Sequence, residues 1–180
     1  MWNGVRDLIG EIKRCEATKA TMAAVAMAYI CIDTMAFLGM PENKEAQSRD
    51  DFIDWVNTYL KGHTDQPYQY SGKDVYAARC SVLHTFGSEA AFHRNDPNIK
   101  LFGYHNGGKH AYDAAIDKRL VIIGTASFLN DVILAVQAFL TDCKQDEALR
   151  SRVEQRLQKV LQVSPIFRAP PDVHNANVSK

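Results

Sequence analysis

Apolar residues recur every three or four positions over most of the chain, with polar and charged residues between them. This spacing gathers the apolar side chains on one face of an α-helix, where they can pack against neighbouring elements. The pattern predicts five to six helices, which occupy about residues 3–16, 20–38, 48–62, 71–87, 128–140 and 149–161. Short connections between consecutive helices favour an antiparallel bundle.

The signals that begin and end helices agree with this pattern. The second predicted helix is apolar at almost every position, so we expect it to lie in the middle of the fold, and Gly39 and Pro41 end it. Ser48 is followed three residues later by Asp51, which is the pattern of a capping box at the start of the third helix. A similar signal at Ser71 opens the fourth helix.

The segment between the fourth and fifth helices has the composition of β-strands. Residues 99–105 and 120–123 are rich in β-branched and aromatic side chains, and Asn106-Gly107-Gly108 is a strong turn signal. These signals predict a small β-hairpin at about residues 98–124, inserted into the helical bundle. The predicted fold class is therefore mainly α.

The length and composition indicate one folded domain. The 180 residues are 46% hydrophobic, which is enough for a single core of ordinary density. We assign residues 1–163 to this helical domain. Residues 164–180 contain three prolines and little to bury, so we expect an extended or disordered C-terminal tail.

The charge balance limits the kinds of partner. The chain has 21 Lys and Arg residues against 21 Asp and Glu residues, so its formal net charge is zero. This balance excludes the broad positive field of a non-specific nucleic-acid binder, and any RNA contact must be local. Lys73, Arg94, Lys100 and Lys109 are candidates for a local basic groove, and ordinary solvated surface positions explain each of them as well.

Several features favour a cytoplasmic protein. Residues 2–19 carry charges of both signs and no continuous apolar segment, unlike a cleavable signal peptide. Asp33 interrupts the apolar segment at residues 20–40, which disfavours a membrane-spanning helix. The four cysteines are widely spaced and form no CxxC pair, so we expect reduced thiols; they are Cys15, Cys31, Cys80 and Cys143.

Arg79 and His84 interrupt an otherwise apolar stretch of the fourth helix. A guanidinium among apolar neighbours needs a carboxylate, a backbone acceptor or a bound anion to compensate its burial. Asp33 in the second helix and Asp54 in the third are candidates for that carboxylate. In this structural interpretation, His84 is a hydrogen-bonded core histidine.

The same two residues also support a functional interpretation. Their spacing, Arg79-x-x-x-x-His84 on a capped helix of a small helical domain, resembles the Rx4-6H motif of the HEPN superfamily. The resemblance implies a compact helical bundle that forms a homodimer, with two motifs facing each other across a cleft. Many members of this family are metal-independent endoribonucleases of toxin–antitoxin or antiviral defence systems, and others are inactive binding modules.

The chemistry of the two side chains suits RNA cleavage. Histidine titrates near neutral pH and can remove the proton of a ribose 2′-OH or protonate the leaving 5′ oxygen. Arg79 would stabilise the extra negative charge of the phosphorane. The resemblance implies no metal and no other cofactor. RNA and an antitoxin or other protein are the expected partners, with no membrane.

Two further interpretations stay open. Cys80 stands directly after the arginine, where active members of the family commonly have a polar residue. In the first interpretation, this departure leaves the site inactive, and the chain is a HEPN-like interaction or scaffold protein with Arg79 in a buried ion pair. Alternatively, the arginine serves an enzyme or binder of a small anionic ligand.

A helical wheel adds a geometric expectation. At about 100° per residue, His84 lies about 140° around the helix from Arg79. Arg79 falls among the apolar positions that we expect to be packed. We therefore expect that a single chain does not bring both side chains to one phosphate, so that catalysis requires a dimer cleft.

Other chemical motifs are weaker. His105 and His110 flank the glycine turn, but their spacing matches no common zinc site, and we predict no metal site. The segment Asn106-Gly107-Gly108-Lys109 lacks the remainder of a phosphate-binding loop, so we interpret it as a hairpin tip.

Overall fold

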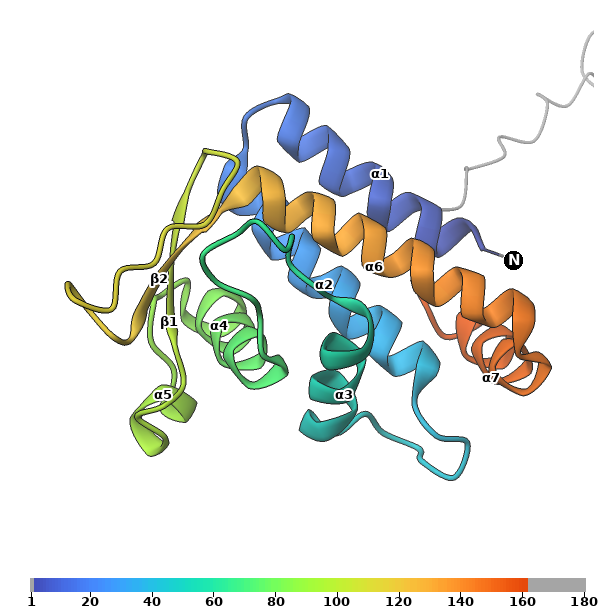
Figure 1. Ribbon diagram of the computed structural model, residues 1–180. Helices are drawn as coiled ribbons and strands as arrows, with labels where there is room; N and C mark the ends of the chain where they lie inside the picture. Colours follow the sequence, from blue (N-terminus) through green and yellow to red (C-terminus); the bar gives the residue numbers. More distant parts are fainter. Residues whose placement is uncertain (1, 162–180) are drawn as a thin grey trace, which may run out of the picture.

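The computed structural model describes residues 2–161. Seven helices and two strands follow one another in this part of the chain (Figure 1). They are α1 (Asn3–Ala17), α2 (Thr21–Gly39), α3 (Arg49–Tyr59), α4 (Gly72–Thr85), α5 (Ala91–Asn95), β1 (Leu101–His105), β2 (Leu120–Gly124), α6 (Thr125–Gln145) and α7 (Glu147–Leu157). The predicted mainly α fold with a small β insertion is confirmed, and the predicted tail at residues 164–180 lies outside the described residues.

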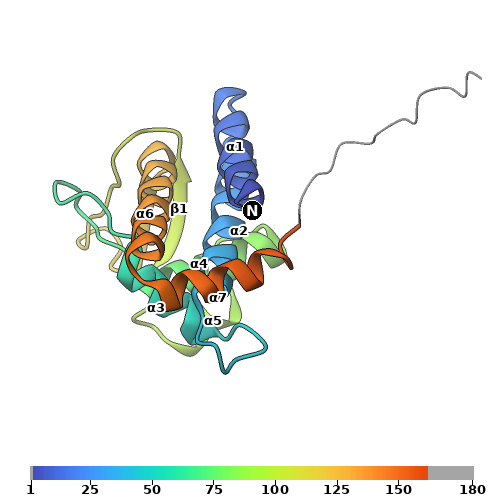
Figure 2. The ribbon, with the colours of Figure 1, turned by 90° about the vertical axis from the view of Figure 1, so that its right-hand side faces the viewer.

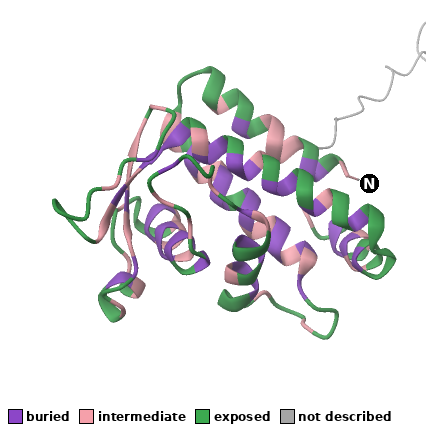
Figure 3. Ribbon diagram, in the orientation of Figure 1, coloured by how far each residue is buried: buried purple, intermediate pink, exposed green. Residues whose placement is uncertain are grey.

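Helix α2 lies at the centre of the fold, as its apolar sequence predicts. It contacts α1, α3, α4, α6 and α7, and Figure 3 shows buried positions along most of its length. Figure 2 shows α7 crossing the ends of α2 and α6, which it contacts. By length and composition α2 and α6 are both apolar enough to cross a membrane, and about half of each apolar window, 50% and 44%, is buried inside the protein.

The predicted capping signals form at the starts of α3 and α4. The Ser48 hydroxyl accepts a hydrogen bond from the Asp51 amide at 3.3 Å, and the Asp51 carboxylate accepts one from the Ser48 amide at 2.8 Å. The Ser71 hydroxyl caps α4 by accepting from the Asp74 amide at 3.2 Å. These contacts satisfy amide groups that have no partner within the helix.

The two strands pair in parallel, so the predicted hairpin is wrong in strand direction. Leu101 lies opposite Leu120, and His105 lies opposite Gly124. Parallel strands need a crossover rather than a tight turn, and residues 106–119 supply it. The glycine turn does reverse the chain, because Ala111 forms an antiparallel bridge with Ile122. Strand composition identified the two paired segments but not their relative direction.

Helix α5 is an element that the apolar pattern did not predict. It has only five residues, too few to show a helical period. The buried imidazole of His93 holds it in place, since Nδ1 accepts from the Ala90 amide and Nε2 lies 3.0 Å from the Lys100 carbonyl oxygen. The helix is thereby fixed beside the start of β1.

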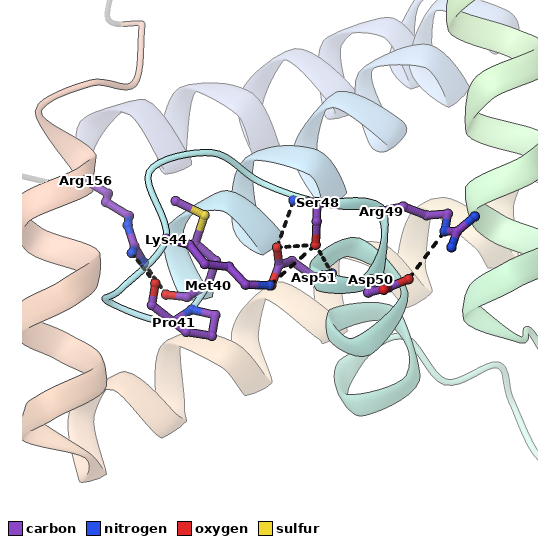
Figure 4. A network of polar contacts seen from close by, with 8 residues as sticks. All are labelled: Met40, Pro41, Lys44, Ser48, Arg49, Asp50, Asp51 and Arg156. Carbon is purple, nitrogen blue, oxygen red and sulfur yellow. Dashed lines mark hydrogen bonds and ion pairs between the residues drawn. The ribbon is translucent and has the colours of Figure 1, made fainter.

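Arg156 of α7 closes the carboxyl end of α2 (Figure 4). Its Nη1 donates to the carbonyl oxygens of Leu38, at 3.2 Å, and of Met40, and its Nη2 donates to that of Pro41 at 2.7 Å. The last carbonyl groups of a helix have no partner within it. The buried guanidinium of Arg156 satisfies the Leu38 carbonyl in the last turn of α2 and two carbonyls that directly follow the helix.

Candidate functional site

Arg79 projects from α4 toward α2, where it meets Asp33. Its Nε and Nη2 each lie 2.7 Å from the same carboxylate oxygen, Oδ2 of Asp33. Both side chains are 22% exposed, so the pair lies at the edge of the core. Asp54, the other predicted carboxylate, is exposed on α3 and has no contact with Arg79 within the described residues. Of the two acids, the structure therefore places only Asp33 beside the arginine.

His84 lies next to the same guanidinium. Its Nε2 is 3.2 Å from Nη1 of Arg79, and the residue is exposed to solvent. The expectation that one chain keeps these side chains apart is wrong. A helical wheel shows only the direction in which each side chain leaves the helix. The arginine side chain is long enough to extend along the helix axis to the imidazole of His84. His84 is therefore a surface residue in direct contact with Arg79, not a core histidine.

The contact with Arg79 assigns donor and acceptor roles to the two side chains. Arginine has hydrogen-bond donors and no acceptor, so Nη1 donates and Nε2 of the imidazole accepts. The proton of the neutral ring is then on Nδ1. A doubly protonated imidazole has no lone pair for this bond, and it would place a second positive charge against the guanidinium. As a hydrogen bond, this contact has Nε2 of His84 as the acceptor, which is the nitrogen that can take a proton at the site.

Burial and charge act in opposite directions on the Arg79–Asp33 pair. Burial raises the pKa of the Asp33 carboxyl, and the Arg79 guanidinium opposes this shift. Burial also disfavours the charged form of Arg79, but the Asp33 carboxylate outweighs it and the pKa of Arg79 is raised. The guanidinium therefore stays charged, and its Nε edge is held by the carboxylate.

A groove runs between α4 and α5 beside these residues. It has a volume of about 430 Å³ and is more apolar than polar. Among its lining residues are Tyr76, Cys80, His84, Phe92, Arg94 and Asn95. Cys80 is half-buried, and its Sγ lies 3.9 Å from Nη1 of Arg79. We call Arg79, His84, Asp33 and Cys80 the α4 site.

Only one of the four predicted basic residues borders the α4 site. Arg94 lines the groove. Lys73 is exposed near the start of α4, and Lys109 forms an ion pair with Asp65 at 2.6 Å. The Nζ of Lys100 donates to the Lys118 carbonyl oxygen at 2.5 Å. The structure therefore does not gather these cations into one basic groove.

Arg49 is a cation near the groove that the sequence did not indicate. It begins α3, and its guanidinium carbon lies 5.3 Å from the centre of the Phe92 ring. Such a cation–π contact is available only because α3 and α5 lie close together in space. No local sequence signal could have paired residues 43 positions apart.

A second cluster of titratable side chains lies elsewhere in the protein, and the sequence did not predict it. We call it the buried chain: Asp131, Tyr70 and His110, with His63 at its solvent-exposed end. The Tyr70 hydroxyl donates to Oδ2 of Asp131 at 3.0 Å and is hydrogen-bonded to Nε2 of His110. Oδ1 of Asp131 lies 3.1 Å from Nε2 of His63, whose side chain is 44% exposed. These groups come from two loops and α6.

The hydrogen bonds that run from His110 through Tyr70 to Asp131 have a fixed direction. Nδ1 of His110 accepts the Gly124 amide hydrogen at 3.0 Å, so the ring proton is on Nε2 and is donated to Tyr70. Burial lowers the pKa of His110 to about 4. Burial raises the pKa of Asp131 to about 6.

Within residues 2–161, no group of three or more metal-binding side chains gathers at His105, at His110 or elsewhere.

Comparisons with known proteins add no assignment. No protein-family model matches the chain, and no curated protein or solved structure matches it. The residues of the two clusters and their geometry are therefore the basis for a functional proposal.

Proposed function

We propose that this protein is a metal-independent endoribonuclease of the HEPN type, with Arg79 and His84 as its catalytic residues. One observation carries the proposal: the guanidinium and a basic imidazole nitrogen lie 3.2 Å apart within a single chain, and His84 faces solvent. Two groups this close can contact the same phosphodiester. The spacing resembles the motif of that family, and the mainly helical fold is consistent with it.

Three residues of the α4 site have defined roles in this proposal: His84, Arg79 and Asp33. His84 takes the proton of the ribose 2′-OH at Nε2 and then protonates the leaving oxygen. Arg79 stabilises the negative charge that develops on the phosphorane. Asp33 holds the Nε edge of the guanidinium, so that Nη1 stays directed toward His84. The substrate phosphate replaces the direct contact between Nη1 and Nε2.

The proposal includes the partners and setting implied by the resemblance. They are a homodimer, an RNA substrate, an antitoxin or other protein partner, and a role in cytoplasmic toxin–antitoxin or antiviral defence. The dimer is proposed on the resemblance alone. The two side chains meet within one chain, so a second copy is not needed to bring them together.

A second candidate is a catalytically inactive HEPN-like interaction or scaffold protein. The observation that favours it is the Asp33 carboxylate, which neutralises Arg79 and occupies two of its donors at 2.7 Å. In that case the arginine connects α4 to α2, and His84 is a surface residue without a chemical role. This candidate predicts that the α4 site contributes to stability and that RNA is not cleaved.

Cleavage of single-stranded RNA in EDTA distinguishes the two candidates. The purified protein is expected to cleave, and His84→Ala and Arg79→Ala are each expected to slow cleavage about 100-fold or more, as is typical for the loss of general acid–base or electrostatic catalysis. His105→Ala is the matched control, because His105 is the last residue of β1 and does not line the groove between α4 and α5, and it should leave the rate unchanged. Circular dichroism checks that each variant is folded.

Two results would contradict the ribonuclease proposal. The first is a wild-type protein that cleaves no RNA. The second is a folded His84→Ala variant that cleaves as fast as the wild type. Loss of folding in Arg79→Ala, with no cleavage by the wild type, would favour the scaffold candidate.

A further inference from the structure

The groove between α4 and α5 adjoins the residues that would cleave the phosphodiester. Cys80 and His84 form part of its wall. Any group that fills the groove therefore lies next to the imidazole. A nucleotide consists of a base joined to a phosphate through one sugar, so a base in this groove would place a neighbouring phosphate at Arg79.

The walls of the groove suit a flat apolar ring. Tyr76 and Phe92 are both half-buried, and their rings meet edge to face with centres 5.5 Å apart. Arg49 lies over the Phe92 ring at 5.3 Å, which fixes the ring from a third helix. Half-buried aromatic side chains stack on nucleobases, and this contact accepts any base because every base has a π-face.

The groove also offers polar groups around an apolar interior. Glu89, Arg94 and Asn95 line it and are exposed. Carboxylate, guanidinium and amide groups can hydrogen-bond the edges of a base. The volume of about 430 Å³ is within the size range of small-ligand sites. A base must be unstacked to enter such a groove, which selects single-stranded RNA.

We propose that the groove between α4 and α5 binds one unpaired nucleobase of the RNA, next to the phosphate held by Arg79 and His84. This inference rests on the proposed ribonuclease function and deepens it, because it names a subsite that determines where the strand is cut. Phe92 is its main stacking residue, and Tyr76 supports that ring.

Binding of uncleavable oligonucleotides tests the subsite independently of catalysis. The probes are fluorescently labelled 2′-O-methyl pentanucleotides, which lack the 2′-OH that cleavage requires, and a matched series with one base removed at each position in turn. Fluorescence anisotropy gives the dissociation constants. For the wild type, removal of the base at one position should weaken binding about tenfold, the effect expected for one stacked base.

Variants then assign that effect to the groove. In Phe92→Ala the difference between intact and abasic probes should disappear, and in Phe92→Leu, which keeps an apolar side chain, most of it should also be lost. Phe86→Ala is the matched aromatic control, because Phe86 is 69% exposed at the end of α4 and does not line the groove. It should retain the tenfold difference.

The outcomes separate this inference from the proposed function. A tenfold difference that survives in Phe92→Ala and Phe92→Leu, or an equal affinity of the wild type for all probes, overturns the subsite even if the protein cleaves RNA. A difference that depends on Phe92 in a protein that cleaves no RNA supports the subsite as a base-binding site and removes only the ribonuclease activity.

Discussion

The α4 site and the buried chain contain similar side chains but differ in their access to water. At the α4 site, His84 is exposed and Arg79 is partly exposed, so water is an alternative partner for each. In the buried chain, Asp131 and His110 are 1% and 3% exposed and depend on each other through Tyr70. Polar groups with access to water are therefore available for chemistry, whereas groups without it mainly affect stability.

The largest expected effect is on the buried chain. Tyr70→Phe removes the hydroxyl that donates to Asp131 and bonds to His110, and it leaves both groups buried without that partner. The free energy of unfolding should fall by about 2–3 kcal/mol, the typical penalty for buried polar groups left unpaired. Urea unfolding followed by circular dichroism measures it.

Tyr112→Phe is the control for that substitution. Its hydroxyl donates to the Lys118 carbonyl oxygen at 3.3 Å in an exposed loop, where water can replace it. The loss should stay within about 0.5 kcal/mol. Equal losses for the two tyrosines would show that the buried chain is not a special determinant of stability.

The next effect is on the pH dependence of stability. The pKa of Asp131 is raised to about 6 from an ordinary value of 3.8. Its carboxyl group therefore binds a proton more readily in the folded protein than in the unfolded chain. Its contribution to stability is therefore complete below about pH 4 and is lost as the pH rises through 6. The pKa of His110 is lowered from 6.5 to about 4, so its contribution is lost as the pH falls through that range.

Asp131→Asn separates these two contributions, because it removes only the first. As the pH falls from 7 to 4, the wild type should become more stable relative to the variant, whereas the variant retains the loss caused by His110. Urea midpoints at several pH values measure the difference between the two proteins. A constant difference over this range would contradict the assignment of a buried, readily protonated carboxyl to Asp131.

The smallest effect is expected at the α4 site. Asp33→Asn weakens the ion pair with Arg79, but both side chains are 22% exposed and water partly compensates. We expect a loss of about 1–2 kcal/mol, between the values for exposed and buried pairs. Asp54→Asn on the exposed face of α3 is the control and should change stability by less than about 0.5 kcal/mol. Thermal unfolding of the two variants compares them, and equal losses would contradict the role of Asp33.

Local sequence signals predicted the helices because each is defined by its own apolar period and capping residues. The apolar composition of α2 placed it at the centre, and Ser48 and Ser71 marked the starts of α3 and α4. The parallel pairing of β1 and β2 was missed, since strand direction depends on the path of residues 106–119 rather than on strand composition. Helix α5 was missed because five residues show no period.

The same limit applies to the two polar clusters. Arg79 and His84 are five residues apart, so their spacing is visible in the sequence. The helical wheel gave only the angle between them around the helix, which wrongly suggested that their side chains do not meet. The members of the buried chain lie up to 68 residues apart along the sequence, from His63 to Asp131. Such pairs are brought together only by tertiary packing, and no alternation or spacing in one sequence indicates them.

The contact of Arg156 with the end of α2 has a consequence for how the protein is made. The carbonyl oxygens of Leu38, Met40 and Pro41 accept hydrogen bonds from Arg156, a residue that the ribosome adds more than a hundred positions later. Domains fold as units as they emerge during synthesis, and unfinished chains expose apolar surface. A nascent chain that has not yet reached α7 thus lacks the donor for the carboxyl end of its central helix, and completion of the core waits for α7, the last described helix.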